Sequence, residues 1–178
     1  QIELKEFLDY KANQYELIDF ITSDPIQIPH RYKQKEDIEI AGFLTASIAW
    51  GNRLSILKSA NKMMALMDDA PYDFIINHKK SDLSIFEGFV HRTFNATDLT
   101  LFVRSLQNIY KNHQGLENVF NSNKSSLQHT IHDFKSIFFE INHPQRTLKH
   151  VSDPLKGSAA KRLNMFMRWM VRSNTKGV

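Results

Sequence analysis

The sequence contains no cysteine, which excludes a disulfide framework, a thiolate metal site and a thiol nucleophile. It contains no run of 18 apolar residues, so no transmembrane helix is expected. The first ten residues, QIELKEFLDY, lack the basic and apolar regions of a signal peptide. Together these absences predict a cytoplasmic protein without a membrane partner.

Several catalytic and cofactor-binding motifs are also missing. The sequence has no P-loop, no GxGxxG and no GxSxG, which argues against nucleotide-phosphate binding of those types and against a serine-hydrolase elbow. Its eight histidines never form an HExxH pair. We therefore expect neither a metal site nor an organic cofactor.

Acidic residues are nearly absent from the last part of the chain. Between residues 141 and 178, Asp153 is the single acid against eight cations, a net charge of +7. Because the whole chain is +4, the first 140 residues carry −3. The eight cations are Arg146, Lys149, Lys156, Lys161, Arg162, Arg168, Arg172 and Lys176. A localised basic block is the usual footprint of a polyanion partner; the alternative is a solubilising charged face.

Apolar residues recur with helical spacing almost everywhere, and no strand-like alternation persists for six residues. The pattern predicts an all-α fold of seven or eight helices around one core. Residues 36–50, EDIEIAGFLTASIAW, are apolar on nearly every side and should form its central buried helix. We expect a helical bundle domain at 1–140. Residues 141–178 should add a basic linker, a hairpin and a helix that begin a C-terminal subdomain truncated in this chain.

Local signals place the other elements. Gly51 is a candidate C-cap for the central helix, Asn52 precedes the next helix, and Pro71 opens a short one. An N-cap pair, Asn95 and Asp98, begins a helix that runs to about Lys111. Further helices are expected at 3–15, at 82–94 with a break near Gly88, and at 125–139, and the segment NHPQRTLKHVSDP should be a polar linker.

The stretch DPLKGSAAKRLNMFMRWMVR, residues 153–172, combines a tight turn with a basic helix. The expected buried stripe is Leu163, Phe166, Met167 and Met170, and the opposite face carries Lys161, Arg168 and Arg172 with Arg162 at its flank. Backbone N–H groups beside Gly157, Ser158 and Ala159 suit a phosphate, because small side chains allow it to come close and the helix dipole favours it. The alternative is that Ser158 is an N-cap and Gly157 only a turn residue.

The segment LKGSAAKRLNMFMRW resembles the hairpin and following helix of helix–hairpin–helix DNA glycosylases. It is most similar to that of the 8-oxoguanine glycosylase/lyases of archaea and thermophilic bacteria, in which a (L/I)-K-G-x-G-x-K turn ends in the nucleophilic lysine. Leu155, Lys156 and Gly157 match this pattern, Ala159 replaces its second glycine, and Lys161 falls on the nucleophile. The segment DIEIAGFLTASIAWGNR is similar to the buried helix before the DNA-probing loop of these enzymes, which places Trp50, Gly51, Asn52 and Arg53 in that loop.

The whole chain also resembles a family of uncharacterised bacterial proteins, through GFLTASIAWGNR, FEGFVHRTF and DPLKGSAAKRLNMFMRWMVR. Members of that family continue with an LDxHxxR stretch, which looks like the segment that holds the glycosylase catalytic Asp. The 178 residues of this chain do not include that stretch, so we expect its catalytic site to be incomplete.

The resemblance implies a base-excision DNA glycosylase/AP lyase involved in DNA repair, which would flip a base and attack C1′ of the sugar with Lys161. His91 and Arg92, between two aromatic residues, could stack a flipped base or grip a phosphate. The other interpretation of His91 is a satisfied, partly buried core residue. The partner expected is DNA or RNA, and the sequence does not distinguish the two.

Two further functions remain open. A non-catalytic nucleic-acid-binding protein on the same scaffold is favoured by Ala159 in the hairpin and by Trp50, Gly51 and Asn52 in the loop. An enzyme acting on a free or RNA-borne nucleoside through the same pocket is the third. Neither the target base nor the oligomeric state follows from the sequence.

Overall fold

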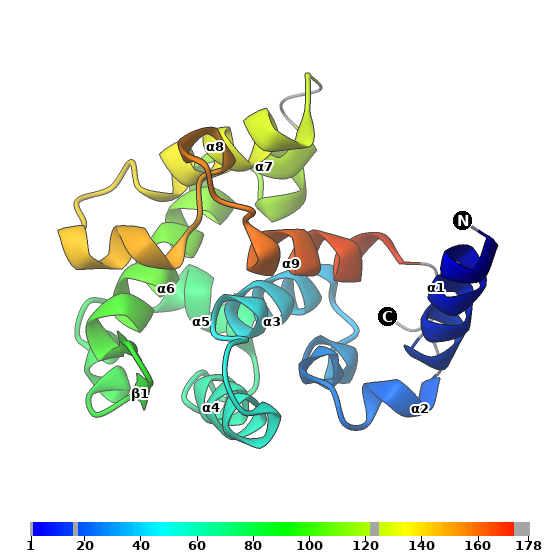
Figure 1. Ribbon diagram of the computed structural model, residues 1–178. Coiled ribbons are helices and arrows are strands. Elements are labelled where there is room, and N and C mark those ends of the chain that lie inside the picture. The colour runs from blue at the N-terminus through cyan, green and yellow to red at the C-terminus, as the bar shows by residue number, and fades with distance from the viewer. Residues whose placement is uncertain (1, 16–17, 122–124, 173–178) are drawn as a thin grey trace.

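The all-α prediction is confirmed by a computed structural model, which describes residues 2–15, 18–121 and 125–172 (Figure 1). The α-helices in these residues are α1 (Ile2–Tyr15), α2 (Ile18–Ile21), α3 (Lys35–Ser47), α4 (Arg53–Ala65), α5 (Pro71–Asn77), α6 (Ala96–Asn112), α7 (Leu116–Asn121), α8 (Leu127–Phe138) and α9 (Lys161–Val171).

Short elements connect these helices. The 3₁₀ helices are η1 (Pro25–Gln27), η2 (Pro29–Arg31), η3 (Asp82–Phe86), η4 (Gln145–His150) and η5 (Pro154–Lys156), and an antiparallel pair is formed by β1 (Val90–His91) and β2 (Phe94–Asn95). The expectation of a broken helix at 82–94 is therefore wrong. Gly88 and Arg92 both have positive φ, 74° and 54°, which is incompatible with a continuing right-handed helix.

Helix α3 is the centre of the core, as its composition predicts. Residues 39–47 are all buried, and the helix contacts α4, α5, α9, η1 and η2. Its most extensive contact is with α9, where Gly42 lets the two helices approach closely: a Cβ at this position would lie 2.9 Å from Cε of Met170. The helix ends at Ser47 with Ile48 as its C-cap, so Gly51 does not cap it as expected. Gly51 instead occupies a turn before α4 with φ of +99°.

At three helix starts, the local capping residues were sufficient to predict where the helix begins. Asn52 accepts hydrogen bonds from the backbone N–H groups of Leu54 and Ser55 at the start of α4, and Pro71 is the first residue of α5. Asn95 and Asp98 form a complete capping box at the start of α6. These predictions are confirmed because a cap needs only residues within one turn.

The segment between α8 and α9 differs from the expected polar linker. Thr147, His150 and Val151 are buried, and η4 packs against α6. The segment is therefore part of the core, since its polar side chains find buried partners that its sequence alone does not show.

Helix α9 buries Leu163 and Phe166 as predicted, whereas Met167 and Met170 are only half-buried. Trp169 was missed: its side chain is buried in the core as well. The stripe is thus wider than the four predicted positions and includes the residue next to Arg168.

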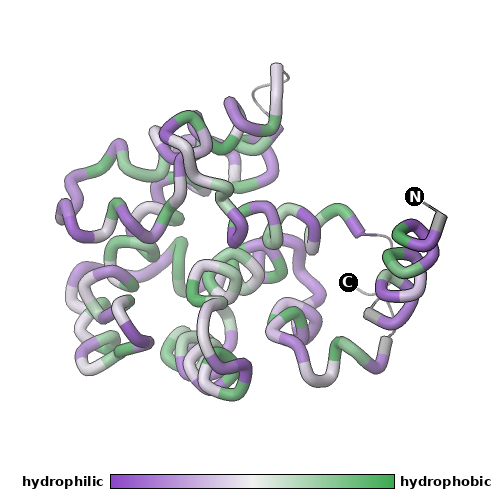
Figure 2. The backbone as a smooth tube through the Cα atoms, viewed as in Figure 1, coloured by the Kyte–Doolittle hydropathy of each residue, from purple (hydrophilic) through white to green (hydrophobic). Residues whose placement is uncertain are grey.

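Helix α1 stands apart from the bundle, beyond the C-terminal end of α9 (Figure 1). The helix predicted at 3–15 is confirmed, but its apolar stripe is not packed: Leu4, Phe7 and Leu8 are all more than half exposed. Figure 2 shows hydrophobic and hydrophilic positions alternating along this helix. None of the helices described in residues 2–172 is long and apolar enough to span a membrane.

Candidate nucleic-acid interface

The hairpin at residues 153–160 is built around Asp153. Its carboxylate accepts a hydrogen bond from Leu155 N (3.1 Å), and its carbonyl accepts bonds from the N–H groups of Lys156 and Ser158. His132 on α8 approaches the same carboxylate at 3.0 Å. Burial disfavours the ionised form of Asp153, but the hydrogen bond and the charge of His132 outweigh it and hold the pKa of this carboxyl below its usual value. The single acid of the basic block therefore fixes the turn.

The outer side of this hairpin is open. Lys156, Gly157 and Ala159 are exposed, and a Cβ at Gly157 would meet nothing within 4 Å. Gly157 has φ of +81°, in the left-handed region where glycine is favoured. The backbone here is accessible to a ligand on a side lined by small residues and one lysine.

Helix α9 begins at Lys161, with Ala160 rather than Ser158 as its N-cap. Ala160 has φ of +46° and no side chain that could cap the first turn. Ser158 still contributes, because its hydroxyl accepts a hydrogen bond from Ala160 N at 3.1 Å. The N–H groups of the first turn of α9 thus receive no capping side chain from the N-cap position, and this end of the helix carries the positive end of its dipole.

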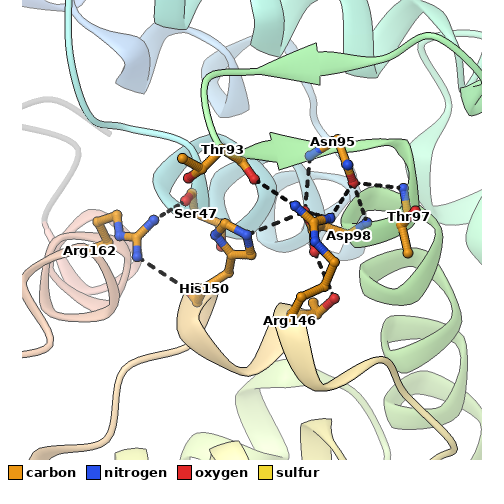
Figure 3. Close-up of polar contacts among 9 residues, drawn as sticks. Ser47, Thr93, Asn95, Thr97, Asp98, Arg146, His150 and Arg162 are labelled. Atoms are coloured by element: carbon orange, nitrogen blue, oxygen red, sulfur yellow. Dashed lines mark hydrogen bonds and ion pairs between the residues drawn. The ribbon is translucent and has the colours of Figure 1, made fainter.

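The two neighbouring cations at the start of α9 point in different directions. Lys161 is exposed, whereas Arg162 turns inward and its guanidinium donates to the carbonyl of Ser47 at 2.6 Å and of His150 at 3.4 Å (Figure 3). Ser47 is the last residue of α3, so Arg162 places a positive charge at the negative end of the central helix. Burial lowers the pKa of the Arg162 guanidinium. The contacts of Arg162 are those of a positioning residue rather than of a phosphate ligand.

Trp50, in the predicted probing loop, contacts residues at the start of α9 and in the 91–92 turn. The Arg162 guanidinium lies 4.6 Å from the indole centroid, the ring of His150 stacks on it at 6.0 Å, and the ring of His91 meets it edge-on at 5.3 Å. The half-buried indole therefore packs against protein groups on several sides. It brings the start of α9, the 50–53 turn and the 91–92 turn into one neighbourhood.

His91 agrees with the interpretation of a satisfied core histidine. It is 2% exposed, with Nδ1 2.9 Å from the Ser59 hydroxyl and Nε2 3.4 Å from the carbonyl of Trp50. Burial lowers the pKa of its imidazole. Its neighbour Arg92 is exposed, and Nη1 of Arg92 would lie 2.8 Å from a Cβ at Gly51. Arg92, not His91, is the member of this pair that a ligand could reach.

The other two residues of the predicted probing loop already have partners. The Asn52 side-chain oxygen is engaged in the cap of α4. Arg53 lies over the ring of Phe20 and within 3.7 Å of the Asp24 carboxylate, although its side chain is half exposed. The side chain of Asn52 is thus held in place by the cap of α4, whereas the side chain of Arg53 is partly accessible to solvent.

The two remaining arginines of α9 are not equivalent. Arg168 is exposed, seven residues after Lys161 and so on the same face of the helix. Arg172 is half-buried and stands at the C-cap of α9 in extended conformation. Of the three cations predicted to share one face, Lys161 and Arg168 are thus exposed and Arg172 is half-buried.

A buried polar network lies behind this surface, and sequence reasoning missed it (Figure 3). The fully buried Asp98 carboxylate accepts from Arg146 Nη1 at 2.7 Å and from the Thr147 hydroxyl at 2.7 Å, and Nε2 of His150 lies 3.3 Å from it. Burial lowers the pKa of His150, although the nearby Asp98 charge opposes that shift. The only sequence signal was the capping box of Asp98, which does not reveal a partner about 50 residues away.

The network ties the C-terminal segment to the bundle. Arg146 also donates to the Asn95 side chain and to the Thr93 carbonyl, next to the 91–92 turn. No group of three or more His, Cys, Asp or Glu that could hold a metal occurs among residues 2–15, 18–121 and 125–172. This region offers backbone N–H groups and exposed cations, among them the amines of Lys156 and Lys161.

A family model described as protein of unknown function (DUF2400) matches residues 24–178. The chain belongs to this family, so the expected kinship with an uncharacterised family is confirmed, over residues 24–178 rather than over the whole chain. Helix α1 precedes the match. Neither the curated proteins nor the solved structures include a match to this chain.

Proposed function

We propose that this DUF2400 protein binds nucleic acid through a surface that comprises the hairpin 153–160, the first turn of α9 and the exposed Arg92. The observation that supports the proposal most is the pairing of an open Gly157–Ala159 turn with exposed Lys156 and Lys161 on either side of it. Such a turn admits a phosphate to the backbone while the two amines neutralise its charge.

The rigidity of this surface also supports the proposal. Asp153 and His132 fix one end of the hairpin, and Arg162 anchors the first turn of α9 to α3 and Trp50. A preorganised cationic surface loses less conformational entropy on binding than one made of mobile side chains. The internal position of Arg162 therefore serves the interface indirectly.

The chemistry we propose for this surface is that of a glycosylase/AP lyase, with Lys161 as the nucleophile. The Lys161 amine attacks C1′ as the glycosidic C1′–N bond breaks, and the base departs with one proton of the amine. The C1′–O4′ bond of the sugar then breaks, O4′ takes the second proton, and the resulting imine links enzyme and sugar. This assignment depends on the resemblance of residues 155–161 to the glycosylase hairpin.

Non-catalytic binding on the same surface is the second candidate. The observation that favours it is the exposure of Lys161, which stands on the surface as a phosphate ligand does and is not enclosed by groups that would activate it as a nucleophile. Lys161 would then be a phosphate ligand like Lys156.

Borohydride trapping separates the two candidates. The full chain is incubated with duplexes that carry a damaged base or an abasic site, and borohydride reduces any imine to a stable adduct. A lyase gives an adduct that is lost in Lys161→Ala and retained in the matched variant Lys156→Ala. Salt-dependent binding without an adduct supports the non-catalytic nucleic-acid-binding protein. If the chain binds neither DNA nor RNA at low salt, both candidate functions are rejected.

A further inference from the structure

The hydroxyl of Ser59 and the imidazole of His91 form a pair that the proposed nucleic-acid surface does not use. Oγ of Ser59 on α4 lies 2.9 Å from Nδ1 of His91 on β1. Ser59 is half-buried, whereas His91 is 2% exposed. A ligand that approaches from solvent therefore meets the serine oxygen before it meets the imidazole.

Backbone carbonyls decide which nitrogen of His91 carries the hydrogen. Nε2 lies 3.4 Å from the carbonyl oxygen of Trp50, and the carbonyl of Ile48 also bonds to the ring. Because a carbonyl oxygen only accepts, Nε2 holds the hydrogen and Nδ1 presents a lone pair. Burial lowers the pKa of this imidazole and so favours its neutral form. The Ser59 hydroxyl therefore donates to Nδ1, which is the arrangement of a serine nucleophile, its base and a group that orients the base.

Positive charge surrounds this pair. Lys62 follows Ser59 by one turn of α4, is exposed and extends over the ring of Phe89, 5.9 Å from its centroid. Arg92 is exposed as well, and its charge contributes to the lowered pKa of the neighbouring imidazole. Neither α4 nor the segment 90–95 contains an acidic residue, and the nearest acid before that segment is Glu87. Cations in this position favour an anionic substrate such as a phosphate ester.

We propose that Ser59 accepts a phosphoryl group from an anionic phosphate ester, with His91 as its general base. Arg92 and Lys62 provide positive charge for the phosphate oxygens. Oγ of Ser59 attacks phosphorus as its proton passes to Nδ1 of His91. The P–O bond to the alcohol breaks, the alcohol oxygen takes a proton from water, and the imidazolium returns its proton to water. The products are phosphorylated Ser59 and the free alcohol. Arg92 also belongs to the proposed nucleic-acid surface, but this reaction does not depend on nucleic-acid binding.

Diisopropyl fluorophosphate tests the nucleophile independently of the cations, because it is a neutral phosphoryl donor. Mass spectrometry of the treated chain should find one diisopropylphosphoryl group, on Ser59. The adduct should be absent from Ser59→Ala and retained in Ser55→Ala, which changes an exposed serine one turn earlier on the same helix. No adduct, or an adduct that Ser59→Ala retains, overturns the proposal.

The absence of cysteine from the chain allows a second measurement. At neutral pH, Ser59→Cys should react with iodoacetamide about tenfold faster than Ser55→Cys, although position 59 is the less exposed, because His91 takes the thiol proton. Adding His91→Gln should remove the difference, and circular dichroism shows whether that variant folds. An equal or slower rate for Ser59→Cys overturns the role of His91 whether or not His91→Gln folds.

Bis(p-nitrophenyl) phosphate tests the substrate class, because it is an anionic ester with a coloured leaving group. The chain should release p-nitrophenol and Ser59→Ala should not. Arg92→Asn should slow the release about tenfold and change the rate with diisopropyl fluorophosphate less than about twofold. Asparagine suits this position because Arg92 has φ of 54°. No release by the chain, or an equal loss with the two reagents, overturns the assignment of an anionic substrate. These measurements use no nucleic acid, so their failure is distinct from failure of the proposed function.

Discussion

Replacing Arg162 by Met tests whether this cation is a structural anchor. The hydrogen bond from a charged donor to the Ser47 carbonyl at 2.6 Å contributes about 1.5–3 kcal/mol. The 3.4 Å contact with the His150 carbonyl is too long to add much, and the Trp50 ring adds about 0.5–2 kcal/mol. Because methionine keeps most of the aliphatic stem, we expect a loss of roughly 2–4 kcal/mol, which for a chain of this size lowers the melting temperature by roughly 5–15 °C.

The adjacent Lys161→Met is the matched control. Lys161 is exposed, so its replacement should change the free energy of unfolding by no more than about 0.5 kcal/mol. Both variants are followed by thermal unfolding with circular dichroism, and their affinity for a short duplex is measured in parallel. The structure requires Arg162→Met to affect mainly stability and Lys161→Met mainly affinity. Equal melting temperatures for the two variants would refute the inward orientation of Arg162.

Three other predictions follow from single sites. Lys156→Ala should reduce the slope of log affinity against log salt by about one unit, whereas Lys79→Ala, at an exposed lysine of the α5–η3 connection, should not; filter binding from low to high salt measures this. Stability should fall as the pH drops below 6.5, since buried His91 and His150 have lowered pKa values and the unfolded state then binds more protons; urea unfolding at two pH values checks the sign, and His91→Gln should flatten the dependence. Gly42→Leu should cost about 1–3 kcal/mol in thermal melts because it overpacks the contact of α3 with α9, while Gly42→Ala should be tolerated, since the flexible end of Met170 is the nearest atom.

The parts of the fold that the sequence predicts well are those decided by neighbouring residues. Asn52, Pro71 and the Asn95–Asp98 box begin helices through contacts within one turn, and the apolar composition of α3 was sufficient to place it in the core. The β1–β2 hairpin could not be predicted in this way. Its two strands have two residues each, and the left-handed conformation of Arg92 reflects its tertiary surroundings rather than an intrinsic preference.

The candidate site was predictable only as a cluster of charge. Composition identified the basic block, but helical spacing gives no reason for Arg162 to turn inward and Lys161 outward, because that choice depends on the carbonyl of Ser47 more than 100 residues earlier. The buried position of Asp98 is equally non-local. Its partners Arg146 and Thr147 lie in a segment whose sequence is typical of a solvated linker.

The surroundings of Trp50 should make the intrinsic tryptophan fluorescence of the protein sensitive to changes at this site. The chain has two tryptophans, and the second, Trp169, is buried in α9. A protonated imidazole quenches indole emission, and two imidazoles and a guanidinium surround Trp50 at 4.6–6.0 Å. The quantum yield of Trp50 should therefore respond when either histidine gains a proton or when a bound ligand displaces Arg162. A change in the intensity of tryptophan emission would then report a change at the start of α9 without an attached dye.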